Sequence, residues 1–398
     1  MNWKTLQPLV ALLVVSALAA SLGTCELHKQ DAGSTNVGAM ASPEFDARYG
    51  AMIRGALDTI GVGGLQYGVI QANGESYSGG YGFSNSSEMC RMDGQRRLNV
   101  ASLSKPVTAL LTLILHEKGV IHLDSSVFSY AAVPEMNFEP YTRQITFRNI
   151  LKHRAGLSLP SAPFFSVATP KKSALEVVMG NYPEGEPVRA LFRPDSLWMY
   201  SGGGYTLLQH ALEQTTGKSL DRLAGETIFK PLGMTASAFN PTYANQSCNE
   251  QYCGGDGQPL QPYYTVGEAA GGLSVSAADM VKFMEELLRM REGNSRLLSK
   301  STFDQIAAGA EVVDLSIFGI ETQAHMEDGP GFFVHRDGEE VVLYHSGGNP
   351  GVVAYLILST TRRKGIFLSV NTEAGRGLVE ALLTEWGESE GVNLPPFF

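Results

Sequence analysis

Residues 64–82 read GLQYGVIQANGESYSGGYG and place two strand-like runs on either side of Asn73-Gly74. An Asn-Gly pair between two such runs is the strongest short-range indication of a β-hairpin, because both residues accept the positive φ of a tight turn. Two further hairpins are predicted near the other end of the chain. They are GFFVHRDGEEVVLYHSGG, which turns at Asp337-Gly338, and VVAYLILSTTRRKGIFLSVN, which turns within Thr361–Gly365.

The chain between these hairpins is predicted to be mostly helical. A buried helical stripe is indicated by the spacing of Val107, Leu110, Leu111, Ile114 and Leu115. Further helices are expected at Tyr205–Thr216, Ser276–Arg291 and Leu378–Trp386. Strands at both ends predict an α+β fold, an α/β/α sandwich. In this fold one antiparallel sheet is built from both chain ends, helices cover both faces, and a mostly helical segment is inserted.

The composition narrows the class of protein. The 398 residues are 43% hydrophobic and 18% charged, with a formal net charge of −10. These values are typical of a globular protein rather than a disordered or fibrous one. No cluster of Lys and Arg with interleaved aromatic residues is present, so nucleic acid is not expected as a partner.

The N-terminal segment has the pattern of a secretory signal peptide. Lys4 precedes an apolar run at residues 9–18, which is too short for a membrane-spanning helix, and small residues follow. We therefore expect a signal peptide at residues 1–24, no membrane span, and a secreted or periplasmic protein. A lipid anchor on Cys25 is the alternative, because the preceding LGTC pattern loosely resembles a bacterial lipoprotein box.

The rest of the chain is interpreted as a linker followed by one large domain. Residues 25–43 are polar and contain Gly and Ser, as a linker does. The domain at residues 44–390 divides into a sheet part and a helical part. The sheet part is expected at about residues 44–120 and 300–390, and the helical part at about residues 121–299.

The cysteines indicate a disulfide rather than a metal site. Cys248 and Cys253 lie five residues apart in a polar, Gly-rich segment. In an exported protein this spacing favours a disulfide that closes a short loop. A zinc site needs more ligands than this segment provides. The sequence therefore predicts no metal and no cofactor.

The striped helix opens with SLSK, residues 102–105. Positions i and i+3 share a helix face, so Ser102 and Lys105 are expected to lie together while Ser104 points elsewhere. Pro106 fits only the first turn, which places Ser102 near the positive end of the helix dipole. The pair is either a nucleophile with its base or a serine cap with a solvated lysine. A lysine base must be buried, because its usual pKa of about 10.4 has to fall.

Two further motifs provide groups that such a nucleophile requires. Tyr200 lies in WMYSGGGY, residues 198–205, where three glycines before a helix are expected to form a loop that approaches a ligand. YHSGGNPG, residues 344–351, ends a strand, and its glycines leave backbone N–H groups open toward a substrate carbonyl. The alternatives are a tyrosine packed in a turn and a Gly-rich connection with His345 hydrogen-bonded locally.

Together these motifs resemble those of the serine β-lactamase-like family, which includes class C β-lactamases, D-alanyl-D-alanine carboxypeptidases and family VIII esterases. The resemblance extends over about residues 44–390. It includes LKHRAGL (151–157), IFKPLGM (228–234) and AAGGLSVSAADM (269–280), stretches that carry no catalytic role. Serine β-lactamases also carry an S-x-x-K motif and a Lys-Thr-Gly motif.

The resemblance implies a role for each motif. Ser102 would be the acylated nucleophile, Lys105 its proton acceptor or the group that tunes it, and Tyr200 a general base and acid. His345-Ser346-Gly347 would correspond to the Lys-Thr-Gly motif and place His345 and Gly347 at the substrate. The backbone N–H groups of Ser102 and Gly348 would form the oxyanion hole.

Two positions depart from the family pattern. Gly202 stands where Tyr-x-Asn ends in asparagine, and His345, neutral at pH 7, replaces a lysine that meets the substrate carboxylate. Both favour an esterase or a D-amino-acid peptidase over an efficient β-lactamase. We therefore expect a secreted serine hydrolase that cleaves a small ester, amide or peptide. The alternatives are a weak β-lactamase or penicillin-binding protein, an acyltransferase, and a non-catalytic binding relative.

Overall fold

The computed structural model describes residues 41–61, 63–158, 164–183, 185–241, 251–309 and 326–394. The predicted signal peptide, Cys25 and residues 25–40 of the predicted linker lie outside these ranges. The last residue assigned to the linker is helical, since Pro43 opens α2 (Pro43–Ile60) with Ser42 as its N-cap. Within the described ranges, no helix has both the length and the apolar character that a membrane span requires.

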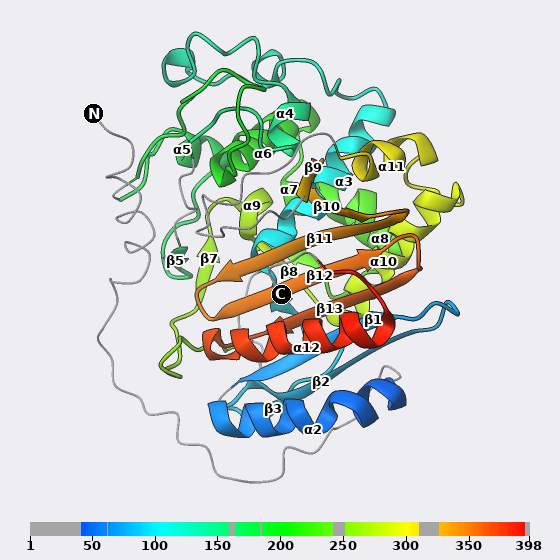
Figure 1. Ribbon diagram of the computed structural model, residues 1–398. Coiled ribbons are helices and arrows are strands. Elements are labelled where there is room, and N and C mark those ends of the chain that lie inside the picture. The colour runs from blue at the N-terminus through cyan, green and yellow to red at the C-terminus, as the bar shows by residue number, and fades with distance from the viewer. Residues whose placement is uncertain are drawn as a thin grey trace, which may run out of the picture.

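An antiparallel sheet of eight strands forms the centre of the described structure (Figure 1). The strand order is β3-β2-β1-β13-β12-β11-β10-β9. The strands are β1 (Gly64–Ile70), β2 (Ser76–Asn85), β3 (Cys90–Arg91), β9 (Met326–Gly329), β10 (Phe332–Asp337), β11 (Glu340–Asn349), β12 (Val352–Ser359) and β13 (Lys364–Val370). Because β1 pairs with β13, strands from both ends of the chain meet in one sheet. The predicted fold class is confirmed.

The three predicted hairpins are present, and their turns follow from the local sequence. β1 and β2 are joined around Asn73-Gly74, where Gly74 has a φ of +89°. β10 and β11 are joined through Gly338, with a φ of +57°. β12 and β13 turn through residues 360–363. Left-handed backbone at both glycines costs little because glycine has no Cβ.

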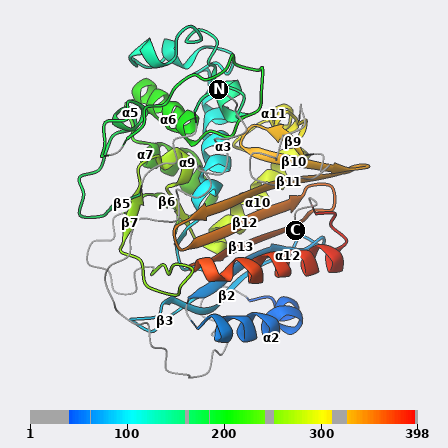
Figure 2. The ribbon, with the colours of Figure 1, turned by 60° about the vertical axis from the view of Figure 1, so that its left-hand side comes forward.

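Both faces of the sheet are covered, which explains why the central strands β1, β12 and β13 are buried along almost their whole length. In β12, Val353, Tyr355 and Ile357 pack on the face covered by α2 and α12 (Arg376–Glu390). The alternating residues Ala354, Leu356 and Leu358 pack on the other face. That face is covered by α3 (Ser104–Glu117), α10 (Ala277–Glu292) and α11 (Lys300–Ala307). Figure 2 shows α2 and α12 side by side on one face and α10 across the sheet from them.

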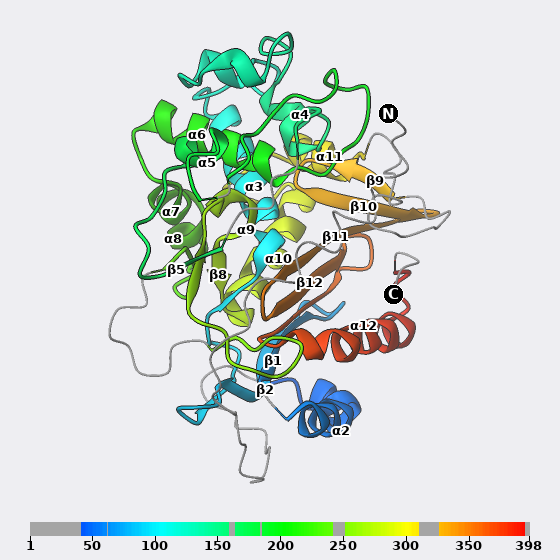
Figure 3. The same cartoon turned by 90° about the vertical axis from the view of Figure 1, so that its left-hand side faces the viewer.

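The upper portion of the helical part lies above the sheet in Figures 1 and 3, and its lower portion lies beside the sheet, on the face that α3 and α10 cover. Its helices are α4 (Phe147–Leu151), α5 (Ala174–Val178), α6 (Gly202–Thr216), α7 (Leu220–Ala224), α8 (Lys230–Leu232) and α9 (Glu268–Gly271). Its short strands are β5 (Phe164–Ser166), β6 (Ala238–Phe239), β7 (Tyr263–Thr265), β8 (Leu273–Val275) and β4 (Leu98–Asn99). Five single turns complete the described elements: Ala101–Leu103, Val127–Ser129, Glu135–Asn137, Gly225–Phe229 and Glu373–Gly375. Although α10 falls in the range assigned to the helical part, it packs against β1, β2 and β13.

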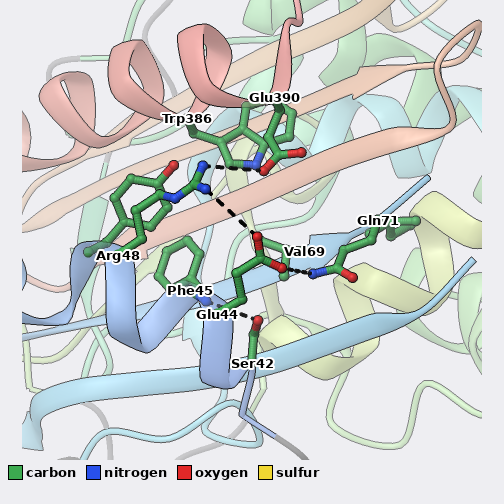
Figure 4. Close-up of a pocket in the computed structure, with 10 residues that line it drawn as sticks. Ser42, Glu44, Phe45, Arg48, Val69, Gln71, Trp386 and Glu390 are labelled. Carbon is green, nitrogen blue, oxygen red and sulfur yellow. Dashed lines mark hydrogen bonds and ion pairs between the residues drawn. The ribbon is translucent and has the colours of Figure 1, made fainter. Parts of the chain in front are cut away.

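A pocket lies between α2, α12 and the end of β1, on the face opposite α3 (Figure 4). Arg48 sits between two carboxylates there, with its guanidinium 3.8 Å from Glu44 and 3.9 Å from Glu390. Phe45 and Trp386 supply apolar walls. None of the predicted site residues lines this pocket, so the candidate active site lies elsewhere.

The cysteines differ from the prediction. Cys253 is a buried thiol, whereas Cys90 is disulfide-bonded. The predicted disulfide between Cys248 and Cys253 is therefore wrong, and Cys248 itself lies outside the described residues. Sequence spacing had favoured the nearest pair. Cys253 is buried, and its backbone is hydrogen-bonded to Asn371 and Glu373.

Candidate active site

Ser102 lies in a tight 3₁₀ turn, Ala101–Leu103, that leads directly into α3. The helix proper begins at Ser104, two residues later than predicted, so Ser102 still lies at the positive end of the helix. The turn is strained at Ala101, whose φ of +50° is unusual for a residue with a Cβ. Two hydrogen bonds hold it, from the Ala101 N–H to Asn99 Oδ1 (3.0 Å) and from the Val100 N–H to the Leu273 carbonyl (2.9 Å).

The predicted pairing of Ser102 with Lys105 is present. Lys105 Nζ lies 3.0 Å from Ser102 Oγ, a hydrogen-bond distance. Ser104 points elsewhere, as expected: its hydroxyl donates to the Ala101 carbonyl (2.6 Å) and accepts from the Leu273 N–H (2.9 Å). Of the two serines, Ser102 is the one beside the amine, and Ser104 fixes the turn to β8.

The Lys105 amine is buried. This contradicts the alternative in which Ser102 is a helix cap and Lys105 is solvated. Lys105 is 2% exposed, and its amine also donates to the Ala270 carbonyl at 2.7 Å. The faces of Tyr200 and Tyr205 lie 4.7 Å and 5.6 Å from Nζ. Removal from water disfavours the charged amine and lowers the pKa of Lys105 to about 7. At neutral pH a large fraction of this amine is unprotonated and able to accept a proton.

Tyr200 joins this pair, although it is distant in sequence. Its phenol is hydrogen-bonded to the Ser102 side chain. Burial raises the pKa of Tyr200 well above 10, and the bond with Ser102 opposes this only in part. The phenol is therefore protonated at neutral pH, which makes it a proton donor rather than a resident base.

The three glycines after Tyr200 differ from the prediction. Gly202, Gly203 and Gly204 are not a loop but the buried first turn of α6. Ser201 caps that helix, since its hydroxyl accepts from the Gly204 N–H at 2.9 Å. A serine cap followed by a long apolar stripe outweighs the low helix propensity of three glycines.

The end of β11 lies beside the Ser102 turn. β10 pairs with β11 only as far as Tyr344, so among the described strands the backbone of His345–Asn349 pairs with β12 alone. No described strand pairs with the other edge of Gly347 and Gly348, and their place in the oxyanion hole stays a prediction. Gly347 packs so closely on the turn that an added Cβ would overlap the Val100 carbonyl oxygen.

His345 is present at the site but carries no positive charge. It is 3% exposed, and its Nδ1 lies 2.7 Å from the Ser346 carbonyl. Burial, and then the charge of Lys105, lowers the pKa of His345 to about 3. The ring lies 6.4 Å from the Tyr200 ring and 5.3 Å from Phe333. It is a neutral, locally bonded imidazole, which was the alternative considered for this residue.

Two residues at the site were missed. Ala270, in α9, supplies the carbonyl that receives the Lys105 amine, and Gln209 holds α9 by accepting from the Ala269 N–H at 3.1 Å. His153 packs on Tyr200 with ring centroids 4.3 Å apart. Ala270 lies in the AAGGLSVSAADM stretch, but its role could not be predicted, because a backbone carbonyl leaves no trace in residue type. His153 lies in the LKHRAGL stretch noted above, which was a signal of position only.

The matching family model is Beta-lactamase, which covers residues 50–385. The chain therefore belongs to the beta-lactamase family, as the resemblance implied. Among curated proteins it is 26% identical over 324 residues to penicillin-binding protein 4* of Bacillus subtilis, covering 77% of this chain and 68% of that protein. It is 22% identical over 323 residues to the D-alanyl-D-alanine-carboxypeptidase/endopeptidase AmpH of Escherichia coli, covering 78% and 80%.

Solved structures agree in fold. A penicillin-binding protein homologue from Pyrococcus abyssi has a TM-score of 0.69 at 21% identity, over 82% of this chain and 74% of that one. D-amino acid amidase from Ochrobactrum anthropi has a TM-score of 0.66 at 20% identity, over 85% and 99%. At these identities the likeness establishes the fold, while activity has to be argued from the site.

Proposed function

We propose that this protein is a serine hydrolase that cleaves a carboxylic ester or amide through an acyl-enzyme on Ser102. One observation carries the proposal: a buried lysine amine with a pKa of about 7 lies 3.0 Å from Ser102 Oγ. A nucleophilic serine needs a neighbouring base at working pH, and a solvated lysine could not serve. A protein that only binds ligands has no need for a buried amine at that position.

The first half of the reaction forms the acyl-enzyme. Ser102 Oγ attacks the substrate carbonyl carbon as its proton passes to the unprotonated Lys105 amine. The backbone N–H groups of Ser102 and Gly348 stabilise the oxyanion of the tetrahedral intermediate. When this intermediate collapses, the bond to the alcohol or amine breaks. The protonated phenol of Tyr200 donates the proton that the leaving group requires, and Tyr200 regains a proton from the Lys105 ammonium.

The second half releases the acid by the same groups in reverse roles. Water attacks the acyl carbon and gives its proton to the Lys105 amine, and Ser102 Oγ leaves and is reprotonated. The product is a carboxylic acid, and the enzyme returns to its starting state. An acceptor alcohol or amine in place of water would give an acyltransferase by the same steps.

The test of this proposal is covalent labelling with a matched serine control. The protein is incubated with a fluorophosphonate, digested and analysed by mass spectrometry. We expect the adduct on Ser102 and none on Ser104. Hydrolysis of p-nitrophenyl butyrate should be lost in Ser102→Ala. Wild-type hydrolysis by Ser102→Ala, or labelling elsewhere only, would refute the proposal.

A second candidate function, cleavage of peptides that end in a carboxylate, is supported by Arg376. Its Nη2 lies 3.8 Å from where a Cβ on Gly348 would be, so a guanidinium borders the proposed oxyanion hole. It could replace the charge that the neutral His345 does not supply. The curated relative AmpH is named as a D-alanyl-D-alanine carboxypeptidase and endopeptidase. In a panel of an ester, a D-amino amide and a D-Ala-D-Ala peptide, Arg376→Gln should raise KM for the peptide alone.

We propose in addition that the protein is exported. The support is the apolar run at residues 9–18 after Lys4, in a chain whose proposed substrates include peptides. Fractionation of cells that express the full chain, compared with a chain lacking residues 1–24, tests this. Equal retention of both in the cytoplasm would contradict export.

A further inference from the structure

His153 accepts hydrogen bonds from the backbone on both sides of Tyr200. It lies just after α4, in a left-handed conformation with a φ of +57°. Its carbonyl accepts from the Met199 N–H at 2.8 Å, and its Nδ1 accepts from the Ser201 N–H at 3.1 Å. The residues immediately before and after Tyr200 are thus both bonded to one histidine.

The imidazole ring also contacts the Tyr200 side chain directly. The two ring centroids are 4.3 Å apart with an interplanar angle of 35°. Trp198 and Tyr205 pack around the same imidazole at 6.0 Å and 5.2 Å. The Tyr200 phenol, which bonds to Ser102, is therefore held in place in two ways. The His153 ring packs against it, and hydrogen bonds to His153 fix the backbone of the residues on either side of Tyr200.

This arrangement requires a neutral imidazole. A nitrogen that accepts from the Ser201 N–H carries no proton, so the ring proton must reside on Nε2. Burial is the main cause that holds the pKa of His153 well below 6.5, and positive charge on the nearby Lys105 amine lowers it further. The other titratable groups that face it are Tyr200 and Tyr205, and Lys152 and Asp328 line a small pocket with it.

We infer that His153 is a positioning residue that fixes the Tyr200 phenol over Ser102 and Lys105. The inference rests on the proposed function, because it assigns Tyr200 a part in acyl transfer. His153 itself touches none of the reacting atoms. It acts by holding residues 199–201 against α3 and by presenting an unprotonated nitrogen that adds no second cation beside Lys105.

Two substitutions separate its contributions. His153→Asn keeps an acceptor close to the place of Nδ1 and is a residue type that tolerates positive φ. His153→Phe keeps a ring but leaves the Ser201 N–H without its acceptor. We expect His153→Phe to lower kcat for p-nitrophenyl butyrate by roughly tenfold or more with KM within about twofold, and His153→Asn to recover most of that loss. Both are compared by circular dichroism and melting temperature.

A double-mutant cycle tests whether His153 acts through Tyr200. If it does, His153→Phe should cost little in a Tyr200→Phe background, because the group that it positions is already gone. Additive losses, or a wild-type kcat in folded His153→Phe, would overturn the inference. Should His153→Phe not fold, His153→Ala takes its place in the cycle. If Ser102→Ala is still fully active, the proposed function fails first and the inference with it. If only the His153 predictions fail, the proposed function stands.

Discussion

Two buried basic side chains in this chain have opposite surroundings. Lys105 is 2% exposed and Arg154 is 6% exposed. Arg154 forms an ion pair with the buried Asp328, which Lys152 also approaches at 3.3 Å. The Lys105 amine instead donates to a hydroxyl and a backbone carbonyl, and burial is the cause that lowers its pKa.

The comparison shows that the charge of Arg154 is structural, whereas the amine of Lys105 is reactive. A buried cation that has a carboxylate partner stays charged and joins the elements that carry the two groups. A buried cation that has no such partner loses part of its preference for the proton, at a cost to stability. The Arg154–Asp328 pair joins the turn after α4 to β9, whereas Lys105 gains basicity that is useful only to a neighbouring hydroxyl. Substitutions in the two clusters should therefore affect activity and stability differently.

Lys105→Met should abolish most of the activity without unfolding the protein. The variant removes the proposed base and leaves a side chain of similar length, so kcat/KM should fall by about 10³-fold, within the usual range for a lost acid–base group. Steady-state hydrolysis of p-nitrophenyl butyrate measures this. Lys152→Met, which removes a partly buried amine from the other cluster, is the control and should retain most activity. Comparable losses in both variants would erase the contrast.

Asp328→Asn should have the opposite effect to Lys105→Met: it should lower stability and leave the activity of the folded protein nearly unchanged. It leaves the guanidinium of Arg154 buried without its carboxylate, and we expect the free energy of unfolding to fall by about 3 kcal/mol. Urea denaturation followed by tryptophan fluorescence measures this. The folded fraction should hydrolyse the ester at close to the wild-type rate. An unchanged unfolding midpoint would mean that the ion pair contributes no stability.

Stability should depend on pH through Lys105. The pKa of Lys105 is lowered to about 7 in the folded state, so between pH 7 and pH 9 the unfolded chain binds a proton that the folded chain has lost. This group's contribution to the free energy of unfolding should therefore rise by about 2 kcal/mol over that range. Below pH 7 both states are protonated and the contribution is level. Lys105→Met should lack the rise, and parallel curves for the two proteins would contradict the shifted pKa.

Alanine substitutions at two neighbouring glycines should have the smallest effects, and the two effects should differ. A Cβ on Gly347 would overlap the Val100 carbonyl, so Gly347→Ala should push β11 away from the Ser102 turn, at a cost of about 1–2 kcal/mol and a reduced kcat. A Cβ on Gly348 meets nothing nearer than Arg376 at 3.8 Å, and Gly348→Ala should fold with wild-type stability. Thermal denaturation and ester hydrolysis distinguish them. Equal behaviour would show that β11 does not pack on the turn as described.

Local sequence determined the elements and one pair within the site. The hairpins at Asn73-Gly74 and Asp337-Gly338 follow from turn residues between apolar runs, and these signals need no distant partner. Ser102 and Lys105 meet because three residues of helical backbone bring their side chains to one face. Tyr200 was assigned through family resemblance, since nothing in its own neighbourhood points to Ser102.

Tertiary structure decided what that pair can do. The Lys105 amine is removed from water because α9 and two tyrosines enclose it. The carbonyl that accepts its hydrogen bond belongs to Ala270, 165 residues away in the chain. The His153 contacts with Tyr200 likewise join α4 to α6 across about 50 residues. Desolvation is a property of everything packed around a group, so it cannot be read from residue spacing. Residue spacing places a hydroxyl beside an amine, and the packing of the folded chain excludes the water that would keep the amine charged.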